Sequence, residues 1–410
     1  MRDPRRRGVD TVGVRAPILT NIHSQLEKTV PRIAVVGVGQ MGRSALSILA
    51  ESDSSATFVA CDRLKESVDA AVALDPSRIV GWVGDVLADT LPLDGVDVVL
   101  NLAGPFFVAS DAVARAAMTR GISYVDVGDD IECTDAILAL HEEAERAGVT
   151  LVTGAGLSPG VSNWMAGKLL DDHPEADGVQ VAWVVHETDP GGLAPLRHML
   201  HMAVSPCPVL RDGRWENSPG FVSSTAGRYR FPEPMGEVEA YDTAHPEPRT
   251  LSRHYPQLKY ANCKGALLPQ WANQAFSTLG QIGFGYTDVK VDVGGVQVEP
   301  AEFLWRLMWE RYSRRPARER HAATAVLVQV LRGVEVLGAL AISDDEVMAR
   351  GTGLGAASAV TTLLETGAPA GAFGPEVLRH DRALALFEEL AVREGGYRQG
   401  VVAMKPATAA

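Results

Sequence analysis

The chain has 410 residues, of which 46% are apolar and 22% are charged, and this is the composition of an ordinary folded protein. That length exceeds the usual size of one hydrophobic core, so two domains with a cleft between them are expected. The formal net charge of −13 means that the protein as a whole should repel nucleic acid and anionic membranes. No apolar run reaches the roughly 18 residues that a membrane helix needs, so we expect a small-molecule partner, no nucleic acid and no membrane.

The four cysteines lie far apart and form no C-x-x-C pair. Their spacing suggests neither a zinc site nor a disulfide framework, so we predict no metal and reduced thiols in a cytoplasmic protein. Residues 1–30 begin with several arginines, and no apolar stretch of signal-peptide length follows them. We predict that residues 1–30 are a flexible extension, with a tail for an anionic partner as the alternative.

Over residues 31–160, short β-branched apolar runs alternate with helix-like segments, as in βαβ units around a parallel sheet. The expected strands are Arg32–Val36, Thr57–Cys61, Arg78–Trp82, Val96–Leu100, Ser123–Val127 and Thr150–Thr153. The expected helices are Gly42–Glu51, Ser67–Leu74, Ser110–Arg120 and Cys133–Ala147. Because the strands are almost continuously apolar, we predict an α/β fold whose N-terminal Rossmann domain is a doubly wound parallel sheet covered on both faces.

After residue 160 the pattern changes, and we predict a second, mixed α/β domain over residues 161–345. A stretch rich in proline, glycine and aromatic residues runs to Pro269 and shows no regular element apart from a helical turn near His198. The other expected elements are a helix at Asn163–Leu170, strands at Val179–His186 and within Gly283–Val298 and Ala323–Ile342, and helices at Pro300–Arg314 and Arg350–Thr366. Residues 346–410 form a C-terminal helical segment, with a loop at Pro369–Pro375 and a helix near Asp381–Glu394, which we expect to return to the Rossmann domain.

The strongest local signal is a hydrophobic strand that runs directly into G-x-G-x-x-G and then into a helix. Gly37 permits the tight turn, Gly39 removes a side chain that would block a pyrophosphate, and Gly42 lets helix and strand pack closely. Gln40 and Met41 begin the helix, whose free amides and positive dipole end favour phosphate. These five residues predict a dinucleotide-binding turn.

Asp62 ends the second predicted strand, 20 residues beyond Gly42, where a carboxylate accepts hydrogen bonds from the adenosine ribose hydroxyls. A carboxylate there favours NAD, because it would repel the 2′-phosphate of NADP. Arg63 follows it and could instead pair with that phosphate, although a solvated surface arginine is the plainer interpretation. We therefore expect NAD as cofactor, with NADP possible.

Polar and turn-forming residues also follow the third and fourth predicted strands: Asp85, and then Asn101, Ala103, Gly104 and Pro105. In open α/β sheets, ligands bind at the carboxyl ends of the strands, so we expect these residues to line the cofactor cleft. Ordinary turn chemistry is the alternative for Asp85 and Asn101.

Several of these segments resemble the saccharopine dehydrogenase-like family, which includes saccharopine reductases, carboxynorspermidine dehydrogenases and lysine 6-dehydrogenases. The segments that carry the resemblance are Gly37–Gly42, Asn101–Phe106, Tyr124–Gly128, Gly154–Gly160 and, less tightly, Phe373–Glu376. The stretch from Gly236 to Lys259 is similar to the substrate domain of lysine 6-dehydrogenase. The resemblance implies a Rossmann domain, a mixed α/β substrate domain whose sheet helps to form a homodimer, and hydride transfer between an amine carbon and nicotinamide.

The protein must then orient a C–H bond, hold the amine neutral and recognise any carboxylate. Asp126, at the end of the fifth predicted strand, could bind the substrate ammonium or accept its proton, and loop capping is the alternative. Arg253 is our candidate carboxylate anchor, with Arg249 second, because a guanidinium binds carboxylate through two hydrogen bonds. Salt bridges are the alternative for both arginines.

Histidines and a lysine offer weaker candidates. His186 with Glu187, and the pair His198 and His201, could act as acids or bases, but an isolated histidine is more often structural. The histidine pair has no acidic or cysteine cluster beside it in the sequence, so it is no evidence for a metal. Lys264 is interpreted as a surface lysine.

The main functional prediction is an NAD(P)-dependent dehydrogenase or reductase that acts on the CH–NH or CH–NH2 group of an amino acid or amine, such as lysine or saccharopine. Reductive condensation of an aldehyde with an amine, as in carboxynorspermidine formation, is one alternative. The other is a nicotinamide-binding regulatory protein without turnover, since a fold does not itself establish a function.

Overall fold

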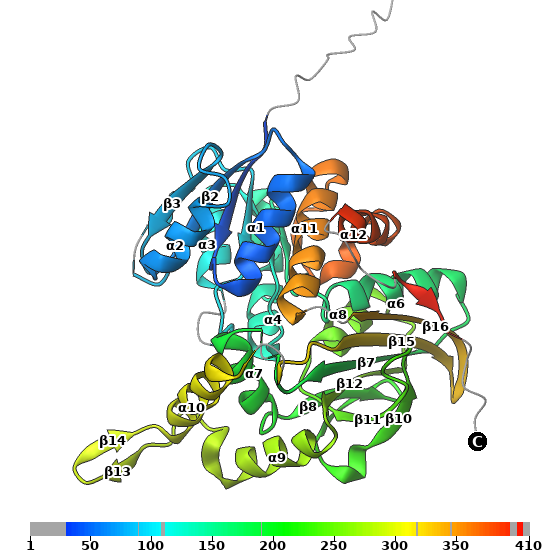
Figure 1. The fold of residues 1–410 in the computed structure, drawn as a ribbon. Coiled ribbons are helices and arrows are strands. Elements are labelled where there is room, and N and C mark those ends of the chain that lie inside the picture. Colours follow the sequence, from blue (N-terminus) through cyan, green and yellow to red (C-terminus); the bar gives the residue numbers. More distant parts are fainter. Residues whose placement is uncertain are drawn as a thin grey trace, which may run out of the picture. The chain divides into compact units, whose positions relative to one another are not determined.

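The computed structural model describes residues 30–88, 90–107, 111–189, 191–316, 319–344, 347–393 and 400–404. The predicted flexible extension over residues 1–30 lies outside this range apart from Val30. From Pro31 onward the chain forms one unit that contains two large sheets (Figure 1).

The first sheet has seven strands in the order β17-β6-β5-β4-β1-β2-β3, all parallel. Their bounds are β1 Arg32–Val36, β2 Thr57–Asp62, β3 Ile79–Val83, β4 Val98–Asn101, β5 Ser123–Asp126, β6 Thr150–Val152 and β17 Gly371–Phe373. The central strands are apolar along their length because both faces are covered, and β1 is buried from Ile33 to Val36. The predicted α/β fold with a doubly wound parallel sheet is confirmed.

Strand β17 corrects the sequence prediction, which placed a loop at Pro369–Pro375. Its three residues pair in parallel with β6, from which they are separated by more than half of the chain. A three-residue strand carries no alternation that a sequence pattern can detect, so only the pairing with β6 defines it.

Helices α1 Gln40–Ser52, α2 Lys65–Val72 and α3 Ala112–Thr119 fall where the sequence placed them. The predicted helix Cys133–Ala147 is instead two helices, α4 Ile131–Leu138 and α5 His141–Ala147. The chain turns at Leu140, whose amide bonds the carbonyl of Ile137 in a tighter turn and whose side chain is buried in the core. The helical spacing of apolar residues continues through this turn, which is why the sequence suggested one helix.

The second sheet has nine strands and is mixed. Seven follow the order β10-β11-β12-β7-β15-β16-β18, and β8 pairs with β12 and β9. Strands β7 and β12 are parallel and the other pairs are antiparallel. Their bounds are β7 Gly178–His186, β8 Cys207–Arg211, β9 Arg214–Ser218, β10 Gly227–Arg230, β11 Glu237–Asp242, β12 Tyr260–Leu268, β15 Thr324–Arg332, β16 Glu335–Asp344 and β18 Val402–Ala403.

Strands β8 to β12 lie in the stretch that ends at Pro269, where we predicted no strands. Strand β9 is almost wholly exposed, and the buried strand β12 contains Asn262 and Lys264, which break its apolar pattern. The pattern fails there because a buried aspartate on β11 pairs with the lysine, a compensation that becomes visible only when the strands are side by side.

The helices of this part are α6 Val161–Asp172, α7 Leu193–Met202, α8 Glu247–His254, α9 Trp271–Leu279 and α10 Pro300–Arg314, with the single π-helical turn η2 Gly280–Phe284 after α9. Strands β13 Val291–Val293 and β14 Val296–Val298 form a separate two-stranded ribbon directly before α10. Figure 1 shows this ribbon beyond α10, away from the nine-stranded sheet.

The C-terminal segment contacts both sheets. Helix α11 Met348–Thr366 packs along α1 and against α12 His380–Arg393, β17 extends the first sheet, and β18 pairs with β16 of the second. Within the described ranges, no helix combines the length and the apolar character needed to cross a bilayer.

Candidate functional site

The glycine turn between β1 and α1 has a shape that fits a dinucleotide. Gly37 has φ +83°, and a Cβ added there would lie 2.4 Å from the backbone nitrogen of Ala103. A Cβ on Gly42 would lie 2.0 Å from the carbonyl oxygen of Gly37, whereas a Cβ on Gly39 would meet no atom within 4 Å. Gly37 and Gly42 are therefore required by the fold, while Gly39 leaves open space at the start of α1 where a pyrophosphate would lie.

Asp62 stands at the end of β2, beside β1 in the sheet. Its Oδ1 accepts a hydrogen bond from the backbone N–H of Leu64 at 3.0 Å, which orients the carboxylate. Arg63 is exposed. Asp85 follows β3, and its Oδ1 accepts a bond from the amide of Leu87 at 2.9 Å.

The loop after β4 is held by its first side chain. Asn101 is buried and donates to the hydroxyl of Tyr124 at 2.9 Å, while its Oδ1 accepts from the amide of Ala103 at 3.0 Å. Asn101 thus shapes the turn at Leu102 and Ala103, the part of the loop whose backbone lies against Gly37. This geometry gives Asn101 the turn-forming role that was its alternative interpretation.

A loop before α7 approaches the cofactor turn from the second domain. A Cβ on Gly191 would lie 2.8 Å from the methyl carbon of Met41, and one on Gly104 would lie 3.1 Å from Cβ of Ala194. The start of α7 therefore packs on both glycine-containing loops of the Rossmann sheet.

Asp126 has no exposed surface. Its Oδ1 accepts hydrogen bonds from the amides of Gly128 and Gly154, both at 2.8 Å, and from the hydroxyl of Thr153 at 3.0 Å. Burial raises its pKa. The three bonds join the loops after β5 and β6, so Asp126 fixes the loop that carries the next two acidic residues.

Those residues are Asp129 and Asp130, and they face His198 of α7. The Nδ1 atom of His198 lies 2.7 Å from Oδ1 of Asp130, and its Nε2 lies 3.6 Å from Oδ2 of Asp129. The histidine is buried, and Nε2 has no hydrogen-bond partner among the described residues. Oδ2 of Asp130 accepts from the amide of Phe107 at 3.1 Å, which ties the group to the loop after β4.

The charges in this group reinforce one another. Burial opposes protonation of His198, but Asp129 and Asp130 outweigh it and raise the pKa of His198 to about 9. Burial would raise the pKa of Asp130, but the facing imidazolium holds that pKa below its usual value. The pKa of Asp129 is raised by burial. The raised pKa of His198 and the lowered pKa of Asp130 favour an imidazolium held against a carboxylate, with Nε2 of the imidazolium not hydrogen-bonded.

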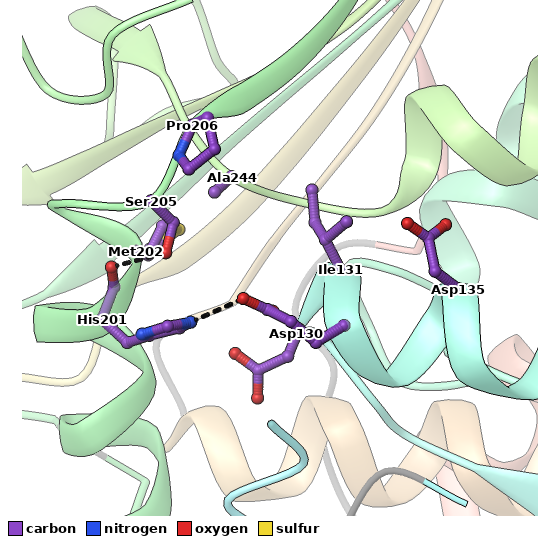
Figure 2. A pocket seen from close by; sticks show the side chains of 9 residues that line it. Asp130, Ile131, Asp135, His201, Met202, Ser205, Pro206 and Ala244 are labelled. Atoms are coloured by element: carbon purple, nitrogen blue, oxygen red, sulfur yellow. Dashed lines mark hydrogen bonds and ion pairs between the residues drawn. The ribbon is translucent and has the colours of Figure 1, made fainter. Parts of the chain in front are cut away.

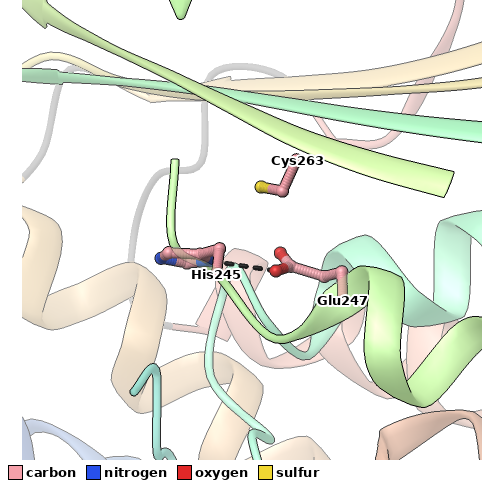
Figure 3. A group of neighbouring side chains, drawn as sticks. All are labelled: His245, Glu247 and Cys263. Carbon is pink, nitrogen blue, oxygen red and sulfur yellow. Dashed lines mark hydrogen bonds and ion pairs between the residues drawn. The ribbon is translucent and has the colours of Figure 1, made fainter. Parts of the chain in front are cut away.

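A second buried group lies behind the first. The rings of His198 and His245 are 5.6 Å apart between centroids, and Nδ1 of His245 lies 2.9 Å from Oε2 of Glu247 (Figure 3). Oε1 of Glu247 accepts from the hydroxyls of Ser158 at 2.5 Å and Ser162 at 3.1 Å. Burial opposes ionisation of Glu247, but His245 outweighs it and lowers its pKa.

Figure 2 shows a hollow beside the first group, with a volume of about 110 Å³. Polar side chains line it, among them those of Asp130, Glu132 and Asp135, together with apolar side chains such as Ile131. His201 of α7 also lines it, and its Nε2 lies 3.0 Å from Oε1 of Glu132. The structure thus brings acidic partners to both His198 and His201, although the sequence shows none beside them.

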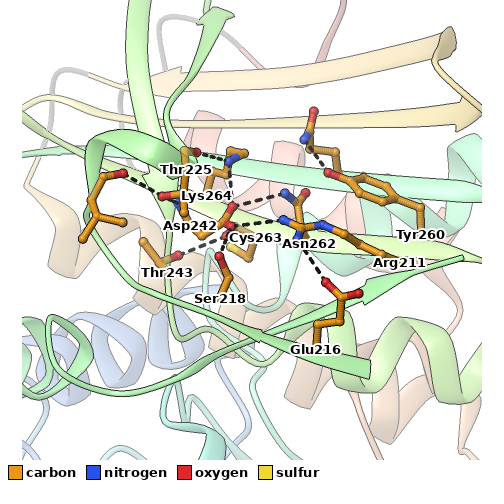
Figure 4. Close-up of polar contacts among 12 residues, drawn as sticks. Arg211, Glu216, Ser218, Thr225, Asp242, Thr243, Tyr260, Asn262, Cys263 and Lys264 are labelled. Atoms are coloured by element: carbon orange, nitrogen blue, oxygen red, sulfur yellow. Dashed lines mark hydrogen bonds and ion pairs between the residues drawn. The ribbon is translucent and has the colours of Figure 1, made fainter. Parts of the chain in front are cut away.

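Lys264 differs from the surface lysine that the sequence suggested. It is 8% exposed, and its Nζ lies 2.6 Å from Oδ1 of Asp242 and 2.5 Å from the carbonyl oxygen of Thr225 (Figure 4). Ser218 donates to the other oxygen of Asp242 at 2.6 Å. The buried pair of Asp242 and Lys264 holds β11 against β12.

The structure does not bring Arg253 to this group by any contact. Arg253 lies exposed on the last turn of α8 and forms no hydrogen bond or ion pair with the described residues. Arg249 lies with its guanidinium 4.6 Å from the ring centroid of Trp215 and 4.0 Å from Oδ1 of Asp135, which lines the hollow. The anchor role of Arg253 and the catalytic role of Asp126 remain predictions.

Sequence reasoning missed Asp129, Asp130, His245 and Glu247. One signal was available, because Asp129 and Asp130 directly follow Gly128 at the carboxyl end of a parallel strand. His245 and Glu247 lie between β11 and β12, in the stretch where we predicted no strands.

Comparison with known proteins shows which proteins this chain resembles. Residues 33–152 match the family model described as the saccharopine dehydrogenase NADP binding domain. A saccharopine dehydrogenase (L-Glu forming) from Saccharomyces cerevisiae has the same fold at 15% identity, with a TM-score of 0.60 over 92% of this chain and 100% of that one.

Two looser matches are GenD2 from gentamicin A biosynthesis in complex with NAD, and a putative myo-inositol dehydrogenase from Sinorhizobium meliloti 1021. The first has 16% identity and a TM-score of 0.39 over 92% of this chain and 97% of that one. The second has 13% identity and a TM-score of 0.40 over 89% and 97%.

The first sheet and its helices thus resemble the NADP-binding domain of saccharopine dehydrogenases, which indicates a nicotinamide cofactor. The match of residues 33–152 and the yeast structure of the same fold confirm the predicted resemblance to saccharopine dehydrogenase-like proteins.

Proposed function

We propose that this chain is an NAD(P)-dependent oxidoreductase that acts on the carbon–nitrogen bond of an amino acid or amine, and that His198 is its proton-transfer group. The observation that carries the proposal is the buried His198, which lies between two aspartates and whose Nε2 forms no hydrogen bond with the described residues. The matched domain family and the yeast saccharopine dehydrogenase of the same fold support the C–N bond as the reacting bond.

The cofactor would supply the hydride acceptor or donor, and the turn at Gly37, Gly39 and Gly42 would hold it. We propose NAD, because the carboxylate of Asp62 is oriented at the end of β2 with one oxygen left for a ribose hydroxyl. Arg63 is exposed beside it, and it is the residue that would accept the 2′-phosphate of NADP.

His198 would move the proton. An amine releases hydride from its carbon only when its nitrogen is neutral, so oxidation requires a base that takes one proton from the ammonium. His198 serves as that base only when it is deprotonated, and Asp129 and Asp130 raise its pKa to about 9. At neutral pH it is a proton donor instead, suited to protonating an imine or carbinolamine nitrogen.

This charge state favours one of our alternatives, the reductive direction, in which an aldehyde and an amine condense and the imine is reduced. We therefore propose that the reductive rate is highest at neutral pH and that the oxidative rate rises with pH up to the pKa of His198. The carboxylates around the hollow would attract the substrate ammonium.

Absorbance of the reduced nicotinamide tests the proposal in both directions, with NAD and NADP and a panel of lysine, saccharopine and related amines. His198→Gln should lower the rate by about 10²- to 10⁴-fold, the usual contribution of general acid–base catalysis, and leave nucleotide affinity unchanged. His186→Gln is the matched control, since His186 hydrogen-bonds Thr188 in the second domain. Tight nucleotide binding without turnover of any amine would instead favour a regulatory protein.

A further inference from the structure

A second hollow adjoins the one beside His198. Its volume is about 420 Å³, against about 110 Å³ for the first. Ser205 and Pro206, which follow α7, line both hollows, and Figure 2 shows these two residues beside the first. A ligand whose reacting group occupies the first hollow therefore has room to extend past Ser205 and Pro206 into the second.

The two hollows differ in charge. Three carboxylates line the first, which we call the acidic hollow: Asp130, Glu132 and Asp135. The second, which we call the neutral hollow, is lined by no charged side chain of the described residues. Its polar side chains are those of Ser205, Asn217, Ser218, Gln281 and Tyr286. The acidic hollow thus suits an ammonium group, whereas the neutral hollow offers no partner to a charged group of either sign.

Ser218 restricts which neutral groups fit. It is buried, and its hydroxyl donates to Oδ2 of Asp242 at 2.6 Å, while Oδ1 of Asp242 pairs with Lys264 at 2.6 Å (Figure 4). Because the one hydroxyl proton of Ser218 is used in this bond, its oxygen can only accept a hydrogen bond from a ligand. The group that binds Ser218 must therefore be a donor, and a carboxylate, which only accepts, does not qualify.

The amide side chains of Asn217 and Gln281 line the same hollow, and each can both donate and accept. A hydroxyl group of the ligand matches both kinds of partner, because it donates to Ser218 and accepts from an amide. A second ammonium would satisfy Ser218 but would find no carboxylate among the described residues that line this hollow. The neutral hollow therefore fits a hydroxyl group better than a carboxylate or an ammonium.

The basic side chains near the acidic hollow already face carboxylates. His201 lines this hollow, and its Nε2 lies 3.0 Å from Oε1 of Glu132. Arg249 lies 4.0 Å from Oδ1 of Asp135, and neither it nor Arg253 lines either hollow. Within the described ranges, the two hollows thus hold no basic group that is free to anchor a substrate carboxylate.

We propose that the substrate is an amino alcohol without a carboxylate, whose nitrogen lies in the acidic hollow and whose hydroxyl group binds Ser218 in the neutral hollow. This inference rests on the proposed function, because it takes the carbon–nitrogen bond as the reacting bond. It narrows the substrate from amino acids and amines in general to hydroxylated amines, and it disfavours saccharopine, which carries carboxylates.

Three amines with the same carbon chain test the class of substrate: aminohexanol, aminohexanoate and hexanediamine. Their far groups are a hydroxyl, a carboxylate and an ammonium. Absorbance of the reduced nicotinamide gives kcat/KM for each with NAD, and calorimetry gives its affinity for the NAD-loaded protein. We expect aminohexanol to exceed the other two by about tenfold in both quantities, the effect of one hydrogen bond made or lost.

Two variants test the neutral hollow itself. Ser218→Ala removes the acceptor and should lower the advantage of aminohexanol by about tenfold. Its control is Ser252→Ala, the same change at a hydroxyl that bonds the carbonyl of Pro248 outside both hollows. Asn217→Lys places a cation in the neutral hollow from an exposed position, so it should favour aminohexanoate. Gln297→Lys adds the same charge at an exposed position outside both hollows and should change no preference.

The outcomes separate this inference from the proposed function. Turnover of aminohexanoate or hexanediamine as fast as of aminohexanol would overturn the inference and leave the proposed reaction standing. Selective binding of aminohexanol without turnover of any amine would support the class of ligand and reject the proposed reaction. An unchanged preference in both Ser218→Ala and Asn217→Lys would overturn the assignment of the neutral hollow.

Discussion

Replacement of His198 by glutamine should change how the stability of this protein depends on pH. The two flanking aspartates raise the pKa of His198 from 6.5 to about 9, so the folded protein binds this proton more tightly than the unfolded chain. Stability from this group is fully present below about pH 6.5 and is lost as the pH rises through about 9. A shift of this size corresponds to about 3 kcal/mol of unfolding free energy.

The measurement is urea unfolding of the parent and of His198→Gln between pH 6 and pH 9, compared as a difference. The buried cysteines also make the folded protein less stable at alkaline pH, because burial raises the pKa of Cys61 and of Cys207 to about 12. That loss is common to both proteins and cancels in the difference. The advantage of the parent over the variant should shrink by about 3 kcal/mol as the pH rises across this range.

His186→Gln provides the control, because burial lowers the pKa of His186 instead of raising it. The difference in unfolding free energy between the parent and this variant should therefore not shrink as the pH rises. A difference between parent and His198→Gln that stays constant with pH would refute the reasoning. His198 would then carry no extra charge in the folded state, and its role as a proton donor at neutral pH would fall with it.

Three further outcomes follow from the geometry. Gly39→Ala should weaken NAD binding at least tenfold with an unchanged melting temperature, because its Cβ meets no protein atom within 4 Å. Gly37→Ala should lower the melting temperature as well, because φ is +83° there and its Cβ would lie 2.4 Å from the backbone. Scanning calorimetry gives the melting temperature of each variant, and titration of nucleotide gives its affinity for NAD. Glu376→Gln should raise the melting temperature at pH 8 but not at pH 4.5, because burial raises the pKa of Glu376 from 4.5 to about 7 and its stabilising proton is lost as the pH rises through that value; an equal shift at both pH values would contradict this. Asp62→Asn should shift the ratio of kcat/KM with NAD to kcat/KM with NADP toward NADP by about tenfold, the effect of losing one charged hydrogen bond to the ribose. An unchanged ratio would show that Asp62 does not contact the ribose.

The first sheet could be predicted well because the sequence patterns that define it each span only a few consecutive residues. Within ten residues the chain passes from an apolar strand through Gly37 and Gly39 to Gly42 in α1, and the neighbouring backbone requires glycine at Gly37 and Gly42. Buried parallel strands are apolar along their whole length, so the sequence also identified six of the seven strands. The ribbon before α10 carries the same kind of local pattern.

The buried group around His198 could not be assembled from the sequence in this way. His198 and Asp130 are 68 residues apart, and Ser158 and Glu247 are 89 residues apart. What joins them is the order of the strands in two sheets and the packing of α7 against the loop after β5. Lys264 shows the same limit, because a lysine in a strand suggests the surface until Asp242 is placed beside it. The sequence by itself determined the cofactor turn and the parallel sheet, since backbone geometry over a few residues dictates them. Only the tertiary structure decided which acidic and basic side chains share a buried site, because a charge is buried only where the fold supplies its partner.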